Sequence, residues 1–235
     1  MTRRHFWKRG SSELSETIAE GEMKVSRNGW ESRIYFTSDL HIGHAKAIEF
    51  TNRPFADVEE MDRKLIENIN ETVGVDDDLW ILGDFVFRGG KDRVREVRDQ
   101  IHCKNVHLVR GNHDRDYSRD GIFTSVNDYV ELNTRFGKFM LFHYPILDWD
   151  SSHHGTIHLH GHIHSTGEYN AENMKRTLGS LFAYGHGKEG EIWEQPLRMY
   201  DVGVDANDYR PVSMMELADK LSLTLAQGKS TETQG

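Results

Sequence analysis

The chain has 235 residues, a formal net charge of −9 and a single cysteine, so it fits one sizeable domain that buries its core without disulfides. The acidic balance argues against a broad basic footprint for duplex nucleic acid, and we expect no stable nucleic-acid partner. No apolar run long enough to span a membrane occurs, and the lone Cys103 is typical of a reducing compartment, so we expect a cytoplasmic protein.

Three parts are expected along the chain. Residues 1–32 are polar and are predicted to form an N-terminal extension. One domain is predicted to span residues 33–225. The polar residues 226–235 are expected to form a disordered tail.

The first half of the domain predicts alternating strands and helices. Short apolar runs at 34–36, 79–82 and 106–109 are typical of buried strands. The apolar residues between Asp57 and Gly74 recur at i, i+3 and i+4, which predicts an amphipathic helix. A second helical pattern at 93–101 completes the order β-α-β-α-β, which is typical of an α/β sheet.

The second half is richer in strands. A second, more β-rich layer is predicted from strand-like runs at 126–132, 139–143, 157–161 and 199–204. Residues 165–198 are expected to lack regular structure and to form a lid or rim over the site. Residues 211–223 predict a terminal amphipathic helix.

A polar fragment directly follows each of five predicted strands. The fragments are Asp39-Leu40-His41, Gly83-Asp84, Gly111-Asn112-His113-Asp114, His143 and Gly161-His162-Ile163-His164. In open α/β sheets, ligands collect at the carboxyl ends of the strands. We therefore expect the five fragments to meet at one site.

The residue types of these fragments point to metal binding. Asp39 and His41 are spaced i, i+2, so both side chains can lie on one side of an extended backbone and hold one ion. His162 and His164 have the same spacing. A pair of divalent ions about 3.5–4 Å apart needs a bridging carboxylate, terminal oxygens and several neutral imidazoles. Asp84, alone at its strand end, is the natural bridge, and the set predicts a two-metal hydrolase.

Through these motifs the chain resembles the calcineurin-like metallophosphoesterase superfamily, especially its small bacterial and phage phosphoesterases. The shared motifs, in the order of the superfamily, are Ser-Asp-Leu-His at 38–41, Gly-Asp-Phe at 83–85, Gly-Asn-His-Asp at 111–114, His-Tyr-Pro at 143–145 and Gly-His-x-His at 161–164. The likeness covers roughly residues 33–215. It implies an α/β fold, a four-layer α/β/β/α sandwich in which two mixed sheets are flanked by helices.

The resemblance also implies two sets of metal ligands that share one carboxylate. The first ion would be held by Asp39, His41, Asp84 and His164, and the second by Asp84, Asn112, His143 and His162. Two divalent ions are the expected cofactors, with manganese as the first choice and iron, nickel, zinc or magnesium as the other usual metals. His158 and His160 alternate with Ile157 and Leu159 along a predicted strand, and they are expected to make hydrogen bonds behind the metal ligands or in the interior instead.

By the same resemblance, the protein would hydrolyse phosphate mono- or diesters of small molecules or nucleotides. Hydroxide that bridges the two ions would attack phosphorus, and His113 would protonate the leaving oxygen as a general acid. Phe87 replaces the acid that supports the catalytic histidine in Ser/Thr protein phosphatases, and Asp114 is expected to replace part of that support. Arg88 and His44 are candidate substrate contacts. The competing interpretations are a surface or ion-pair residue for Arg88 and a helix-start residue with a local hydrogen bond for His44.

Two other functions stay open at this point. A non-catalytic metal-binding scaffold would keep the fold and its ligands without chemistry. A nuclease would admit a short single strand into a metal-lined cleft. The presence of His113 beside a full ligand set favours an enzyme, and the acidic balance argues against the nuclease.

Overall fold

The strands of this chain form two sheets that lie face to face. The computed structural model describes residues 33–173 and 198–223. The first sheet has the order β4-β3-β2-β1-β9, made of β1 (Ile34–Thr37), β2 (Asp78–Ile81), β3 (Asn105–Val109), β4 (Ser125–Asn127) and β9 (Val212–Ser213). Strands β1 to β4 are parallel, and β9 runs antiparallel to β1.

The second sheet is also mixed. It has the order β5-β6-β7-β8, made of β5 (Val130–Thr134), β6 (Gly137–Leu141), β7 (Ile157–His160) and β8 (Met199–Asp201). Strand β5 is antiparallel to β6, while β6, β7 and β8 are parallel. The prediction of two mixed sheets in an α/β fold is therefore confirmed.

Alternate strand residues fill the space between the sheets. Phe36 of β1 and Leu82, directly after β2, share one cluster with Phe139, Leu141 and Leu159 from the second sheet, and all five are 0% exposed. Complete burial of each such side chain contributes about 1.5–3 kcal/mol. This shared core holds the carboxyl ends of both sets of parallel strands in a fixed relation.

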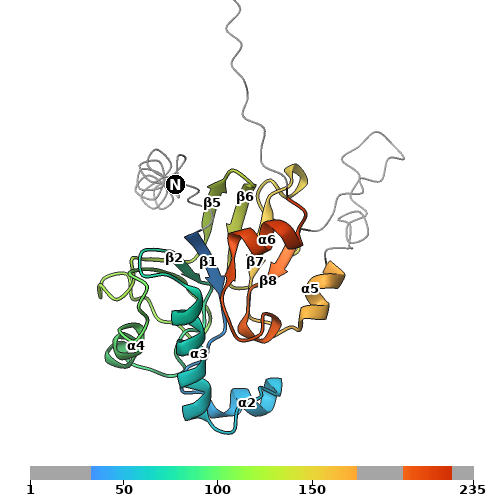
Figure 1. Cartoon of the computed structure of the whole chain (residues 1–235). Coiled ribbons are helices and arrows are strands. Elements are labelled where there is room, and N and C mark those ends of the chain that lie inside the picture. Colours follow the sequence, from blue (N-terminus) through green and yellow to red (C-terminus); the bar gives the residue numbers. More distant parts are fainter. Residues whose placement is uncertain (1–32, 174–197, 224–235) are drawn as a thin grey trace, which may run out of the picture.

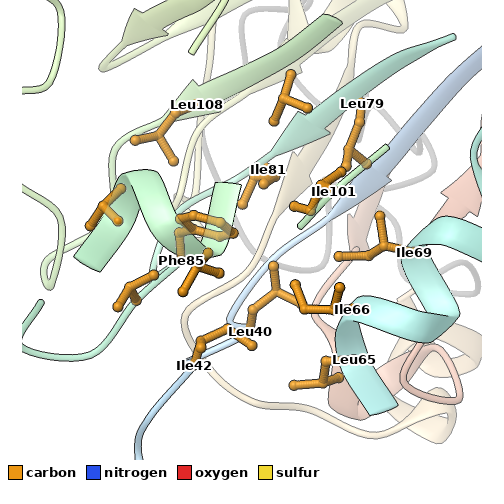
Figure 2. Packing of buried hydrophobic residues seen from close by; sticks show 14 of the residues in the cluster. Leu40, Ile42, Leu65, Ile66, Ile69, Leu79, Ile81, Phe85, Ile101 and Leu108 are labelled. Atoms are coloured by element: carbon orange, nitrogen blue, oxygen red, sulfur yellow. The ribbon is translucent and has the colours of Figure 1, made fainter. Parts of the chain in front are cut away.

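The other face of the first sheet is covered by helices, namely α3 (Val58–Thr72) and α4 (Lys91–Arg98). Leu79 and Ile81 of β2 face this layer, and Figure 2 shows Ile66 and Ile69 of α3 on the same side. Helix α3 begins at Asp57, whose carboxylate accepts a hydrogen bond from a backbone N–H in the first turn. The helix predicted between Asp57 and Gly74 is confirmed.

The outer face of the second sheet is covered by shorter elements. Met140 and Met199 form a small cluster there with Trp149, whose indole N–H donates to the carbonyl of Thr156 at 2.9 Å. Helix α5 (Gly167–Asn173) lies beside β8 (Figure 1). The remaining elements are α2 (Ala45–Thr51), η2 (Ser152–His154), η4 (Val204–Ala206) and α6 (Met214–Lys220).

Three predictions about elements need correction. The single strand predicted at 126–132 is wrong, because β4 and β5 belong to different sheets and the chain crosses between them at 128–129. The stretch 165–198 is not wholly irregular, since α5 lies within it; its residues 174–197 lie outside the described part. The terminal helix is shorter than 211–223, because residues 212–213 pair with β1 as β9.

The predicted extension at 1–32 and tail at 226–235 lie outside the described residues. Within 33–173 and 198–223, no helix has the length and apolar character needed to cross a membrane.

Candidate metal centre

The five polar fragments lie just beyond the carboxyl ends of five strands. Asp39 and His41 follow β1, Asp84 follows β2, and Asn112 follows β3. His143 follows β6 of the second sheet, and His162 and His164 follow β7. The strand order places these ends side by side, because β1, β2 and β3 are neighbours in one sheet and β6 and β7 are neighbours in the other.

The loops that carry these residues have an unusual backbone. Positive φ angles occur at Asp39 (57°), His41 (49°), Asp84 (55°), His162 (74°) and His164 (47°). The left-handed region is rarely occupied by residues other than glycine and costs of the order of 1–3 kcal/mol, and such residues concentrate at functional sites. Backbone hydrogen bonds hold the first two loops together, from the Asp39 N–H to the Gly83 carbonyl at 3.0 Å and from the His41 N–H to the Asp84 carbonyl at 2.9 Å.

Two glycines allow the close approach of the loops. A Cβ at Gly161 would overlap Ser38 Oγ and Asp39 Oδ2, and a Cβ at Gly111 would overlap Asp84 Oδ1. Only glycine lets the backbone come this close to the carboxylates.

The side chains of Asp39, His41 and His164 form one group of possible metal-donor atoms. The Nε2 atoms of His41 and His164 are 3.2 Å apart, and they lie 4.0 and 3.9 Å from Asp39 Oδ1. Asp84 Oδ2 is 3.4 Å from His41 Nε2, so this carboxylate borders the group. These four side chains are the ones predicted for the first ion.

A second group of donor atoms lies on the other side of Asp84. His143 Nε2 is 3.6 Å from Asp84 Oδ2 and 3.1 Å from Asn112 Oδ1. The ring of His162 lies beside this pair, with its centroid 5.1 Å from that of His143. Asp84 therefore contributes to both groups, as expected of a bridge.

The buried polar atoms of the site fit divalent cations. Asp39 is 0% exposed, and its Oδ1 has no hydrogen-bond partner, which is costly for a buried carboxylate oxygen. His143 Nδ1 lies 2.7 Å from the carbonyl of Leu82, so this nitrogen donates and leaves Nε2 as an acceptor facing the site. Carboxylate, amide and imidazole donors are the ligands that first-row divalent metals accept.

The electrostatics of the site agree with this fit. Burial raises the pKa of Asp39 to about 6, while the nearby His143 and His164 oppose that rise. The pKa of His41 is lowered to about 2, first by burial and then by the neighbouring His164. His41 is therefore neutral near pH 7, and a neutral imidazole is the form that binds metal.

His113 lies beside Asp84 with a partly exposed side chain. Its backbone N–H donates to Asp84 Oδ1 at 2.9 Å, and its Nε2 is 4.0 Å from Asp84 Oδ2. His113, His41 and Asp84 each offer a possible metal-ligand atom, and these three atoms lie within 4.8 Å of one another. The side chain of His113 is 37% exposed, whereas that of His143 is 0% exposed. The His113 ring is therefore close to the proposed metal ligand Asp84 and also accessible to solvent.

Asp114 is placed differently from the expectation that it supports the His113 ring. Its carboxylate accepts hydrogen bonds from the backbone N–H groups of Asp84 (2.7 Å), Phe85 (3.2 Å) and Gly111 (2.9 Å). These bonds tie the loop after β2 to the loop after β3. Burial raises the pKa of Asp114, and the hydrogen bonds from the three backbone N–H groups oppose that rise.

His44 and Arg88 flank the aromatic ring of Phe87. His44 is the N-cap of α2, and its Nδ1 accepts a hydrogen bond from the Ala47 N–H at 3.2 Å, in agreement with a helix-start residue that makes a local hydrogen bond. Its ring also lies 3.6 Å from the ring of Phe87, measured between centroids. The guanidinium carbon of Arg88 lies 5.0 Å from the same ring centroid, and Arg88 is exposed.

Sequence reasoning missed two residues that contact the site from behind. Asp205 Oδ2 is 2.7 Å from His164 Nδ1, and Arg53 Nη2 is 2.8 Å from the same oxygen. Neither residue belongs to a motif, and 152 positions separate them. The remaining histidine predictions are confirmed: His158 and His160 are 0% exposed, with ring nitrogens 3.1 and 3.0 Å from the carbonyls of Tyr144 and Gly161.

Two mixed sheets with helices outside, and Asp and His side chains gathered at the strand ends, define a metallophosphoesterase fold. The model of the calcineurin-like phosphoesterase family matches residues 32–209, and the chain belongs to this family. Members of the family act on phosphate esters and usually bind divalent metals, in agreement with the donor groups of the site.

The chain is also similar to proteins from other organisms. An uncharacterised protein of Methanocaldococcus jannaschii is 31% identical over 205 residues, which cover 86% of this chain and 96% of the relative. The gene 66 protein of Mycobacterium phage D29 is 32% identical over 161 residues, covering 57% of this chain and 79% of the phage protein. A solved Aquifex aeolicus protein of unknown function shares the fold, with a TM-score of 0.57, 22% identity, and coverage of 79% of this chain and 97% of that one.

Proposed function

We propose that this protein is a dinuclear metal-dependent phosphoesterase that hydrolyses phosphate mono- or diesters of small molecules or nucleotides. The observation that carries the proposal is the position of Asp84, whose Oδ2 lies 3.4 Å from His41 Nε2 and 3.6 Å from His143 Nε2. One carboxylate oxygen that faces both groups of donors is suited to bridge two ions.

The ligand sets proposed for the ions share Asp84. Asp39, His41, Asp84 and His164 would hold the first ion, and Asp84, Asn112, His143 and His162 the second. When bound, the ions would lower the pKa of water and offset negative charge on the phosphate oxygens. Manganese is our first choice of metal, because carboxylate oxygens accompany the imidazoles in both sets and the second set adds the amide oxygen of Asn112.

We assign the general acid to His113. Its ring is the most exposed of those that border Asp84, and its backbone is fixed by the hydrogen bond to Asp84 Oδ1. A protonated imidazole at this place would donate its proton to the leaving oxygen, a contribution of about 10²- to 10⁴-fold in rate. Asp114 would act on the same step indirectly, by holding the loop that carries His113 against the loop that carries Asp84.

The substrate would lie against Phe87. Arg88 is exposed beside this ring and would contribute a charge-assisted hydrogen bond to phosphate. His44 lies against the ring, and the centroid of the His113 ring is 5.4 Å from that of Phe87. An aromatic ring next to the proposed acid is suited to contact a planar group of the substrate, such as the nucleobase of a nucleotide.

A metal-by-substrate panel tests this proposal. The full chain is stripped with a chelator, reloaded with manganese, nickel, zinc or magnesium, and assayed on bis(p-nitrophenyl) phosphate, p-nitrophenyl phosphate and cyclic nucleotides. We expect turnover that depends on added metal, with two ions bound per chain by elemental analysis. Bound metal without turnover on any ester would instead support the non-catalytic scaffold.

A further inference from the structure

We propose that Asp205, held in place by Arg53, is a positioning residue that orients His164 as a metal ligand. This inference rests on the proposed metal site. It concerns a carboxylate outside the ligand sets, in the 3-10 helix η4 (Val204–Ala206).

The two nitrogens of His164 face different partners. Nδ1 lies 2.7 Å from Asp205 Oδ2, while Nε2 faces the donor group, 3.9 Å from Asp39 Oδ1. A neutral imidazole carries one N–H, and a carboxylate accepts only, so the contact with Asp205 places the proton on Nδ1. The lone pair of Nε2 is then directed at the site, and the ring has one orientation.

Arg53 fixes the carboxylate in turn. Its side chain is 0% exposed and makes two parallel contacts, from Nε to Asp205 Oδ1 at 2.9 Å and from Nη2 to Asp205 Oδ2 at 2.8 Å. A two-pronged pair of this kind restricts rotation of the carboxylate as well as its position. Thr51 Oγ1 lies 3.1 Å from Asp205 Oδ1 and occupies a further direction around the same group.

The same guanidinium also holds the loop of the first ligands. Arg53 Nη2 donates to the carbonyl of Asp39 at 2.8 Å, and Nη1 donates to the carbonyl of Leu40 at 3.1 Å. One side chain thus ties the backbone at Asp39 to the carboxylate behind His164. Asp39 and His164 are both ligands proposed for the first ion, and they come from different loops, after β1 and after β7.

A role in positioning explains features that a surface ion pair would not have. Arg53 and Asp205 are both almost fully shielded from solvent, at 0% and 5% side-chain exposure, and burial of such a pair is costly. By contrast, the backbone carbonyl of Leu82 faces Nδ1 of His143, and Nδ1 of His41 has no hydrogen-bond partner. Unlike these two histidines, His164 has a carboxylate, that of Asp205, beside its Nδ1. Such a partner increases the basicity of Nε2 as a metal ligand.

Metal affinity provides a test that does not depend on turnover. Asp205→Asn keeps the size of the side chain and removes its charge. Arg53→Lys keeps the charge and removes the pair of parallel hydrogen bonds to Asp205. We expect both variants of the full chain to bind Mn²⁺ about 10- to 100-fold more weakly at one of the two sites, measured by competition with a chromophoric chelator. Asp76→Asn, which breaks an exposed pair with Lys104, is the control and should bind as the unaltered protein does.

The outcomes separate this inference from the proposed function. If the unaltered protein binds two Mn²⁺ ions and both variants bind them equally well, Asp205 has no positioning role. If the unaltered protein binds no divalent ion, the proposed metal site fails first. A loss of affinity in Arg53→Lys with an unchanged unfolding midpoint of the metal-free protein supports positioning even where Asp205→Asn does not fold.

Discussion

The backbone N–H of His113 donates a hydrogen bond of 2.9 Å to Oδ1 of Asp84. The proposed acid is therefore attached to the carboxylate proposed to bridge the ions. The other oxygen of Asp84 stays turned toward the histidines of both donor groups. Asp84 thus holds the backbone of His113 with one oxygen and faces His41 and His143 with the other.

Removal of the Asp84 charge should weaken metal binding and lower activity. In Asp84→Asn the shared oxygen becomes a neutral amide, so we expect fewer than two ions per chain and a loss of at least about 10³-fold in kcat/KM, equivalent to several kcal/mol. Elemental analysis and steady-state kinetics measure both effects. Two tightly bound ions in this variant would exclude Asp84 as the bridge.

His113→Asn should separate chemistry from metal binding. The variant keeps the backbone hydrogen bond to Asp84 but has no titratable ring, so we expect both ions to remain bound. Turnover of an alkyl phosphodiester should fall by about 10²- to 10⁴-fold, and less with p-nitrophenolate as the leaving group, which needs little protonation. Equal losses on both substrates, or the loss of an ion, would contradict the role of acid.

Phe87→Ala tests the proposed contact between the Phe87 ring and the nucleobase of a nucleotide substrate. We expect KM for a cyclic nucleotide to rise roughly 2- to 10-fold, the equivalent of about 0.5–1.5 kcal/mol of aromatic contact. KM for an alkyl phosphodiester should change less. Val75→Ala, at a residue that is 49% exposed, provides a comparison at an exposed apolar position. A uniform change in KM across all esters would argue against stacking on Phe87.

Gly161→Ala should distort the site through steric overlap. The added Cβ would meet Ser38 Oγ and Asp39 Oδ2, so we expect the free energy of unfolding to fall by about 1–3 kcal/mol and metal affinity to fall with it. At Gly90 an added Cβ meets nothing within 4 Å, which makes Gly90→Ala the matched control. Urea unfolding of the metal-free proteins measures the difference. Equal stability of the two variants would refute the close packing described at Gly161.

His158 should make stability depend on pH. Burial, followed by the nearby His160, lowers its pKa from 6.5 to about 3. Between pH 6.5 and about 3, His158 is protonated in the unfolded chain but neutral in the folded chain. The contribution of this residue to the free energy of unfolding is therefore complete above pH 6.5 and is lost as the pH falls. The slope for one proton is about 1.4 kcal/mol per pH unit.

The variant His158→Gln isolates that contribution, because it cannot titrate but can still donate to the Tyr144 carbonyl. Urea unfolding of the metal-free proteins between pH 7.5 and 5 should show a shallower decline for the variant. Identical slopes would mean that His158 is not the group that titrates.

Local patterns predicted the parts of the fold that depend on neighbours in sequence. The helix that begins after Asp57 was predictable from its apolar spacing and its N-cap residue. The strand at 126–132 was not, because whether a short apolar run stays in one sheet or crosses to another depends on partners elsewhere. Leu108 pairs with Val126 in the first sheet, while Leu141 pairs with Val130 in the second.

The sequence by itself predicted the alternating strands and helices and the side chains available to hold metal, because periodicity is a local property. The order of its motifs indicated the family, and the two mixed sheets were what that resemblance implied. The tertiary structure alone decided what supports those side chains. Asp114 contacts backbone N–H groups rather than the His113 ring, and Asp205 reaches His164 across 41 positions while it holds Arg53 across 152. Such contacts depend on how closely folded loops approach one another, and no spacing along the chain encodes that distance.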